Sequence, residues 1–159
     1  MGTRLLETDL HRIGWSEYVD LPQWEITGLR AKVDTGARTS ALHVENVEML
    51  PHGRVRFEVV LHRRKRDRRV SVATRIHRRG RVRSSSGHYD TRIFVKTALR
   101  IGAVEREVEL SLVDREKMLF RMLLGRTALA GAFLVDVTHD RLLGRTPRST
   151  PRRRGGAQR

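Results

Sequence analysis

Apolar and polar positions alternate in several short runs of the chain, and the clearest of these runs spans residues 104–112. Apolar side chains take most of its even positions, and glutamates with one serine take the odd ones: Val104, Arg106, Val108, Leu110 and Leu112 against Glu105, Glu107, Glu109 and Ser111. Successive side chains of a strand point to opposite faces, so a period of two is typical of a strand with one buried face. The run therefore predicts a half-buried β-strand.

Two earlier runs, 29–33 and 55–61, have the same period and predict two more strands. Residues 70–72 are the expected hairpin partner of 55–61, with 63–69 as a basic connection. Residues 75–96 are expected to form a long hairpin, because small residues interrupt the pattern at 84–87. Such a tip permits mobility and close approach to a ligand.

The remaining elements are short. An edge strand is expected within 14–21, ended by Pro22, and residues 39–47 fit either one helical turn or a short strand. Residues 123–124 and 133–137 predict strands, with a short helix between them at 127–132. Many short strands separated by glycine turns indicate an all-β fold, a closed barrel with one short C-terminal helix.

Charge divides the 159 residues into a nearly neutral body and two basic segments. Residues 62–83 contain eleven lysines and arginines against one acid, and residues 145–159 contain six arginines and no acid. We interpret 1–12 as a loose arm, 13–144 as one domain and 145–159 as a disordered basic tail. The charge allows a ribosomal protein or nucleic acid as partner, or a solvated loop with a disordered tail.

Several functional classes find no support in the sequence. The chain has no cysteine, no apolar run long enough to cross a membrane and no signal-peptide pattern, so we expect a cytoplasmic protein without a membrane partner. The seven histidines show no ligand spacing, and no His-Glu-x-x-His or phosphate-binding glycine loop is present. We therefore expect no metal and no cofactor.

The candidate chemistry lies where the 29–33 strand stops, at Asp34-Thr35-Gly36. A carboxylate at the end of a buried strand is costly unless it is paired or used. The Thr35 hydroxyl can stiffen the loop, and Gly36 permits an unusual backbone conformation or close approach by a ligand or another chain. By itself, the tripeptide also fits an ordinary turn.

A second stretch, Met122 to Leu129, changes that balance. Asp-Thr-Gly-Ala followed far along the chain by two apolar residues, Gly and Arg resembles the retropepsin fold of aspartic proteases. The longer pattern resembles a bacterial retropepsin-like family named ATP-dependent zinc proteases, often linked to ATP-grasp ribosomal-protein glutamate ligases. It includes the following segments, which lie between residues 13 and 144: Ile13-Gly14-Trp15, Tyr18 to Pro22, Ala31 to His43, Ser86-Gly87, Arg92 and Met122 to Leu129.

The resemblance implies an aspartic peptidase in which Asp34, Thr35 and Gly36 form the catalytic loop. Because the chain has one Asp-Thr-Gly, it implies a homodimer whose two Asp34 carboxylates share a proton. It also implies a support and a substrate-binding set that includes a flap at residues 84–89. The support is Leu123, Leu124 and Gly125, and the substrate-binding set is Ala37, Arg38, Ser86, Gly87, Arg92 and Arg126.

The chain departs from viral retropepsins at Arg38, where those proteases commonly have an aspartate that pairs with the arginine after the second glycine. Arg38 and Arg126 would place two guanidinium groups together, which requires an anion. That anion is either a carboxylate of the body, such as Asp136 or Asp114, or a carboxylate of the substrate. The sequence thus predicts a peptidase acting on an acidic peptide or polyglutamate-like protein tail. The alternative is a non-catalytic module that binds an anionic protein segment.

Overall fold

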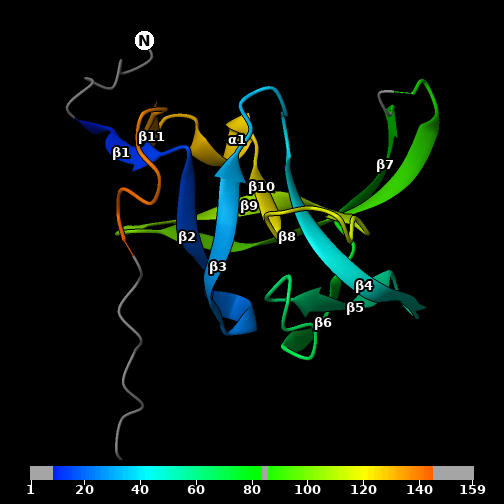
Figure 1. Ribbon diagram of the computed structural model, residues 1–159. Helices are drawn as coiled ribbons and strands as arrows, with labels where there is room; N and C mark the ends of the chain where they lie inside the picture. The colour runs from blue at the N-terminus through cyan, green and yellow to red at the C-terminus, as the bar shows by residue number, and fades with distance from the viewer. Residues whose placement is uncertain (1–8, 84–85, 145–159) are drawn as a thin grey trace, which may run out of the picture.

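The computed structural model describes residues 9–83 and 86–144, and strands dominate this part of the chain (Figure 1). The prediction of an all-β fold with one short helix near the C-terminal end is confirmed. Two short helical segments interrupt the strands, the 3₁₀ turn η2 (Pro22–Trp24) and the helix α1 (Arg126–Leu129). The strands are β1 (His11–Gly14), β2 (Ser16–Leu21), β3 (Ile26–Val33), β4 (Ser40–Leu50), β5 (Arg54–Val60), β6 (Arg69–Arg75), β7 (Arg78–Arg83), β8 (Tyr89–Ile101), β9 (Val104–Val113), β10 (Met122–Leu124) and β11 (Phe133–Asp136).

Within the described residues, strand pairing closes into a ring. The order is β10-β3-β2-β8-β9-β4, and β4 pairs again with β10. The ring is irregular because β10 has three residues and β2 meets β8 through one residue pair, Asp20 with Arg100. Strands β5 and β6 extend the sheet from β4, and β7 pairs with β8. In Figure 1 the β7–β8 hairpin projects from the ring on the same side as the loop between β3 and β4.

The buried face of the ring follows the alternation seen in the sequence. In β9, Val108, Leu110 and Leu112 are buried, whereas Glu105 and Glu107 are exposed. The three buried residues of β9 pack with the inward residues of the other strands into one apolar core, which includes the fully buried Phe57. No helix in the described part of the chain is long and apolar enough to cross a membrane.

Three elements differ from the sequence-based expectation. β4 is an eleven-residue strand, since it pairs with β9, β10 and β5. β2 lies between β3 and β8 and is therefore no edge strand. β1 begins at His11, inside the range 1–12 expected to be a loose arm, because it pairs in parallel with β11.

The buried carboxylate of Glu17 joins the two ends of the described domain. It accepts hydrogen bonds from the backbone N–H groups of Gly14 at 2.7 Å, Leu142 at 3.1 Å and Leu143 at 3.1 Å. Two backbone bonds lie beside it, from Trp15 N–H to the His139 carbonyl and from Arg141 N–H to the Ser16 carbonyl, each 2.9 Å. Three charge-assisted bonds satisfy a carboxylate that would otherwise be costly to bury.

Candidate functional site

The Asp34 loop begins where β3 ends, and its first residue is hydrogen-bonded to β10. β3 and β10 run parallel, with Val33 opposite Leu124, and the Asp34 N–H donates to the Leu124 carbonyl at 2.9 Å. The Gly36 N–H donates to Asp34 Oδ1 at 3.2 Å, and the Ala37 N–H donates to the Asp34 carbonyl at 3.1 Å. Asp34 is half-buried, while Thr35 and Gly36 are exposed. The loop therefore presents its carboxylate at the surface in a defined position.

Gly36 does not have the left-handed backbone conformation that the sequence allowed. It is absent from the glycines with positive φ, and an added Cβ would have Asp34 Oδ1 as its nearest neighbour, at 3.4 Å. The fold of the single chain therefore has room for a larger residue at this position. Close approach by a ligand or another chain is the remaining reason for a glycine at this position.

Gly125 is required by packing against the far end of the same loop. A Cβ at this position would lie 2.5 Å from the carbonyl carbon of Thr39 and 2.7 Å from its oxygen. The Gly125 N–H donates to the buried Ser40 Oγ at 3.0 Å. Of the predicted support residues, Leu124 is buried and bonded to the loop, and Leu123 is half-buried.

Arg126 holds the loop through its carbonyl groups. Its guanidinium donates from Nη1 to the carbonyls of Thr35 at 3.0 Å and Gly36 at 3.1 Å, and its N–H donates to the Ala37 carbonyl at 2.8 Å. Thr127 adds two bonds to the Arg38 carbonyl, from Oγ1 at 2.9 Å and from N–H at 3.1 Å. Arg126 therefore positions the loop through its Nη1 and its backbone N–H.

Sequence reasoning missed Thr39, Ser40 and Thr127 as parts of this site. All three act on or through backbone groups, which any residue type offers as a partner. The available signals were weak: Ser40 is a polar residue entering the apolar run Ala41-Leu42, and Thr127 directly follows Arg126.

Arg38 makes no hydrogen bond or ion pair through its guanidinium in the described part of the chain. Asp136, one carboxylate suggested for it, is bound by Thr138 and Arg12 instead, and these bonds hold the pKa of Asp136 well below its usual range. Asp114, the other, forms no ion pair with Arg38 among the residues that are described. Both expected body partners are therefore wrong.

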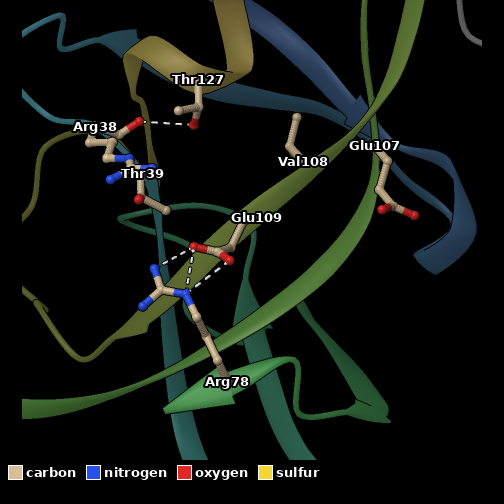
Figure 2. A pocket seen from close by; sticks show the side chains of 7 residues that line it. All are labelled: Arg38, Thr39, Arg78, Glu107, Val108, Glu109 and Thr127. Carbon is tan, nitrogen blue, oxygen red and sulfur yellow. Dashed lines mark hydrogen bonds and ion pairs between the residues drawn. The ribbon is translucent and has the colours of Figure 1, made fainter. Parts of the chain in front are cut away.

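A cavity of about 390 Å³ lies beside Arg38 (Figure 2). Thr39 and Thr127 lie near Arg38, and strand β9 supplies acidic residues to the other part of the lining. Those acids already have partners: Glu109 is bound by Arg78 and His77, and Glu107 lies 3.6 Å from Lys96. The complete lining is Arg38, Thr39, Arg78, Glu107, Val108, Glu109 and Thr127.

The hairpin expected at residues 75–96 is formed by β7 and β8, and its residues 84 and 85 lie outside the described residues. Ser86 and Gly87 follow the tip, and Gly87 has a positive φ of 86°. Arg92 is half-buried on β8, and burial together with the nearby charge of Arg115 lowers the pKa of its guanidinium. Within the described residues, no hydrogen bond joins Gly87 or Arg92 to the Asp34 loop.

The basic segment 62–83 is not one uniform charged face. Arg66 and Arg69 bind Glu45, Arg69 also binds Glu58, and Arg78 binds Glu109.

Across the described residues, no group of three or more His, Cys, Asp or Glu side chains is arranged to hold a metal ion.

The model of a known protein family matches most of this chain. Residues 12–146 match the model of the RimB-like family, described as the retropepsin-like aspartic endopeptidase RimB. The chain belongs to the RimB-like family. The retropepsin-like resemblance drawn from the sequence is confirmed, and the family assignment gives the chain an aspartic-peptidase-like fold.

Curated relatives of this RimB-like chain carry a different name. Proteins of Desulfotalea psychrophila and Parasynechococcus marenigrum, each named probable alpha-L-glutamate ligase, are 34% and 36% identical to it over 137 and 138 residues. Each match covers 83% of this chain and 29% of the relative, so the chain spans less than a third of the length of these relatives.

A solved structure shares the fold of the RimB-like chain. The crystal structure of a Legionella pneumophila protein of unknown function matches with a TM-score of 0.69 at 25% sequence identity. The match covers 83% of this chain and 97% of that protein.

Proposed function

We propose that this chain is an aspartic peptidase in which Asp34 is the catalytic carboxylate. The observation that carries the proposal is the Asp34-Thr35-Gly36 loop, which Leu124 and Arg126 fix from beneath while its carboxylate stays at the surface. A general acid or base must be held in place and within reach of its substrate. This loop meets both conditions in a family described as aspartic endopeptidases.

The mechanism needs a second carboxylate, and we propose that a second copy of the chain supplies it. Two carboxylates about 3 Å apart share one proton, so the ionised one activates water and the protonated one polarises the peptide carbonyl. The sequence has one Asp-Thr-Gly, and its exposed Thr35 and Gly36 leave the loop accessible to an identical loop across a two-fold axis.

We propose that the substrate is an acidic, glutamate-rich peptide or protein tail. Arg38 beside the loop has no carboxylate partner in the described structure, whereas Glu107 and Glu109 of the neighbouring cavity have theirs. A carboxylate of the substrate would form an ion pair with the Arg38 guanidinium. The relatives named for glutamate ligation favour glutamate as the acidic residue.

The direct test is hydrolysis. The purified chain is incubated with a peptide ending in several glutamates and with a matched glutamine peptide, and products are read by mass spectrometry. Release of glutamate from the acidic peptide alone supports the proposal. If neither peptide is cleaved at any protein concentration or pH, the chain is no peptidase for this substrate class.

Substitution of Arg38 should change the substrate preference rather than the fold. We expect Arg38→Ala to weaken binding of the glutamate peptide about tenfold, because one charge-assisted hydrogen bond is lost, with little change for the glutamine peptide. Added salt should weaken the same interaction in the unmodified chain. Fluorescence anisotropy with both peptides measures these effects, and Arg75→Ala, at an exposed position on β6, is the control. A fall in melting temperature with unchanged preference would show that Arg38 is structural.

Substitution of Gly36 should separate the dimer from the fold. We expect Gly36→Ala to melt within a few degrees of the unmodified chain, because the added Cβ has room in the monomer. The dimer should weaken, because the methyl group lies where we place the partner loop. Light scattering over a range of concentrations measures the dimer. A dimer of unchanged strength would mean that the two loops do not meet.

A further inference from the structure

A second cavity, of about 410 Å³, lies at the opposite end of β3 from the Asp34 loop. β3 and β10 run parallel with Met122 beside Ala31, so Arg30, within β3, and Arg121, directly before β10, precede this pair on strands that lead to Asp34 and Gly125. The turn after β5 supplies four more residues, from Leu61 to Arg64. The lining is Tyr18, Gly28, Arg30, Leu61, His62, Arg63, Arg64, Leu119 and Arg121.

Arg121 is a buried cation without a carboxylate partner in the described structure. The residue is only 3% exposed, and its Nε has no hydrogen-bond partner among the described residues. Its Nη2 donates to the backbone carbonyls of Met118 and Glu116. Burial lowers the pKa of this guanidinium, and the charges of Arg63 and Arg66 lower it further. An uncompensated buried charge is strongly unfavourable, so its retention needs a reason.

The nearest carboxylates are already engaged by other arginines. Glu45 and Glu116 both lie in the electrostatic surroundings of Arg121, but Arg66 binds Glu45 at 2.8 Å and also binds Glu116. Glu45 is bound in addition by Arg69 and His43. These ion pairs leave the charge of Arg121 without a dedicated counter-ion.

The other bases of the cavity add to this excess. Arg30, Arg63 and Arg64 are exposed at its walls, and none of them forms an ion pair within the described residues. The charge of Arg30 is one of those that lower the pKa of Asp140, but the Asp140 carboxylate is bound to Ser16 and Arg141.

His62 orders the turn that carries two of these arginines. Its Nδ1 accepts the backbone N–H groups of Arg64 at 3.1 Å and Lys65 at 3.2 Å. In a neutral imidazole the proton is then on Nε2, which is a further donor at the cavity. These bonds fix the backbone of the turn from which the side chains of Arg63 and Arg64 extend.

We propose that this cavity binds a small organic phosphate. Three exposed guanidinium groups above a fourth, buried one match a group of two or more negative charges better than a single carboxylate. The exposed Leu119 and the half-buried Leu61 at the same cavity provide apolar surface for the organic part. The ligand contacts the exposed arginines, and the desolvated Arg121 attracts it through the low-dielectric floor.

This site is separate from the candidate active site, so its ligand is neither the proposed substrate nor a reactant. The cavity beside Arg38 and the middle of β9 shares no lining residue with it. The two sites can therefore be tested independently on the same protein.

Isothermal titration of the full chain with phenyl phosphate tests the proposal, with inorganic phosphate and benzoate as comparison ligands. We expect saturable binding of phenyl phosphate, weaker binding of inorganic phosphate, and benzoate at least tenfold weaker. Arg63→Gln and Arg64→Gln should each weaken phenyl phosphate about tenfold. Arg79→Gln, which removes an exposed charge outside the cavity, and Asp34→Asn should leave the affinity unchanged.

Arg121→Met gives a second, independent readout. Replacing an unpaired buried charge with an apolar side chain of similar length is neutral or stabilising, so the melting temperature without ligand should be no lower than that of the unmodified chain. The rise in melting temperature on adding phenyl phosphate should be smaller than in the unmodified chain. A lower melting temperature would show that Arg121 is held for the fold, which overturns its assigned role.

Three results would overturn the phosphate site. The first is no saturable binding of phenyl phosphate, or binding by Arg63→Gln and Arg64→Gln that is as tight as binding by the unmodified chain. The second is benzoate binding as tightly as phenyl phosphate, which removes the preference for phosphate. The third is binding of single-stranded RNA without binding of phenyl phosphate, which makes the surface a nucleic-acid interface.

Discussion

Asp34→Asn should abolish hydrolysis of the glutamate peptide while the fold and the proposed dimer remain. Asparagine has nearly the same shape, and its side-chain oxygen can still accept the Gly36 N–H as Asp34 Oδ1 does. It cannot carry or exchange the shared proton, and in a dimer the substitution removes both carboxylates at once. Loss of a general acid–base pair lowers the rate by about a thousandfold or more.

The measurement is release of glutamate over time by mass spectrometry, run beside thermal melting and light scattering. Asp67→Asn, at an exposed position in the basic connection between β5 and β6, removes the same charge and is the control. Activity near the original level in Asp34→Asn would exclude an aspartic mechanism at this loop. A variant that also loses its fold would assign Asp34 a structural role.

Gly125→Ala should give the largest loss of stability among single-methyl additions near the site. The new Cβ would lie 2.5 Å from a backbone carbon of Thr39, and neither segment can yield by rotating a side chain. Relief requires β10 to move away from the start of β4, which strains the bonds from Gly125 to Ser40 and from Asp34 to Leu124. We expect the free energy of unfolding to fall by about 3 kcal/mol, at the upper end for overpacking.

Chemical denaturation followed by tryptophan fluorescence measures this loss. Gly53→Ala is the control: Gly53 has a positive φ of 68° but no atom within 4 Å of the added Cβ. It should lose about 1 kcal/mol from backbone strain alone. Equal losses in the two variants would contradict the close packing of Gly125 on Thr39. If the chain is the proposed peptidase, hydrolysis should fall in Gly125→Ala even under conditions where the chain is folded, because the Asp34 loop is displaced.

The strands that pair locally could be predicted from the sequence, and those buried on both faces could not. β9 has one face toward the core, so its alternation of Val108 and Leu110 with Glu107 and Glu109 is visible. The first five residues of β4, Ser40 to Val44, are all buried, because β4 pairs on both sides and lies within the core. A segment buried on both faces shows no alternation of apolar and polar residues, and Ser40 and His43 are buried there although they are polar.

Pairing between distant segments was the second limit. β1 pairs with β11 across more than a hundred residues of chain, and no local pattern in His11 to Gly14 encodes that partner. At the site, the Asp34 loop and its support were recognised because their residue types recur together. The role of Arg126 was not, because the carbonyls of Thr35 and Gly36 that it binds carry no residue-specific signal.

The bonds around Glu17 also determine how this domain can be joined to other sequences. Because β1 pairs with β11 and residues 142–143 bind Glu17, the first and last described strands lie next to each other on the surface. A domain with adjacent ends can be inserted into a longer polypeptide, or permuted by a short linker between its ends, without moving a strand. In two relatives named probable alpha-L-glutamate ligase, the segment that matches this chain makes up 29% of the length.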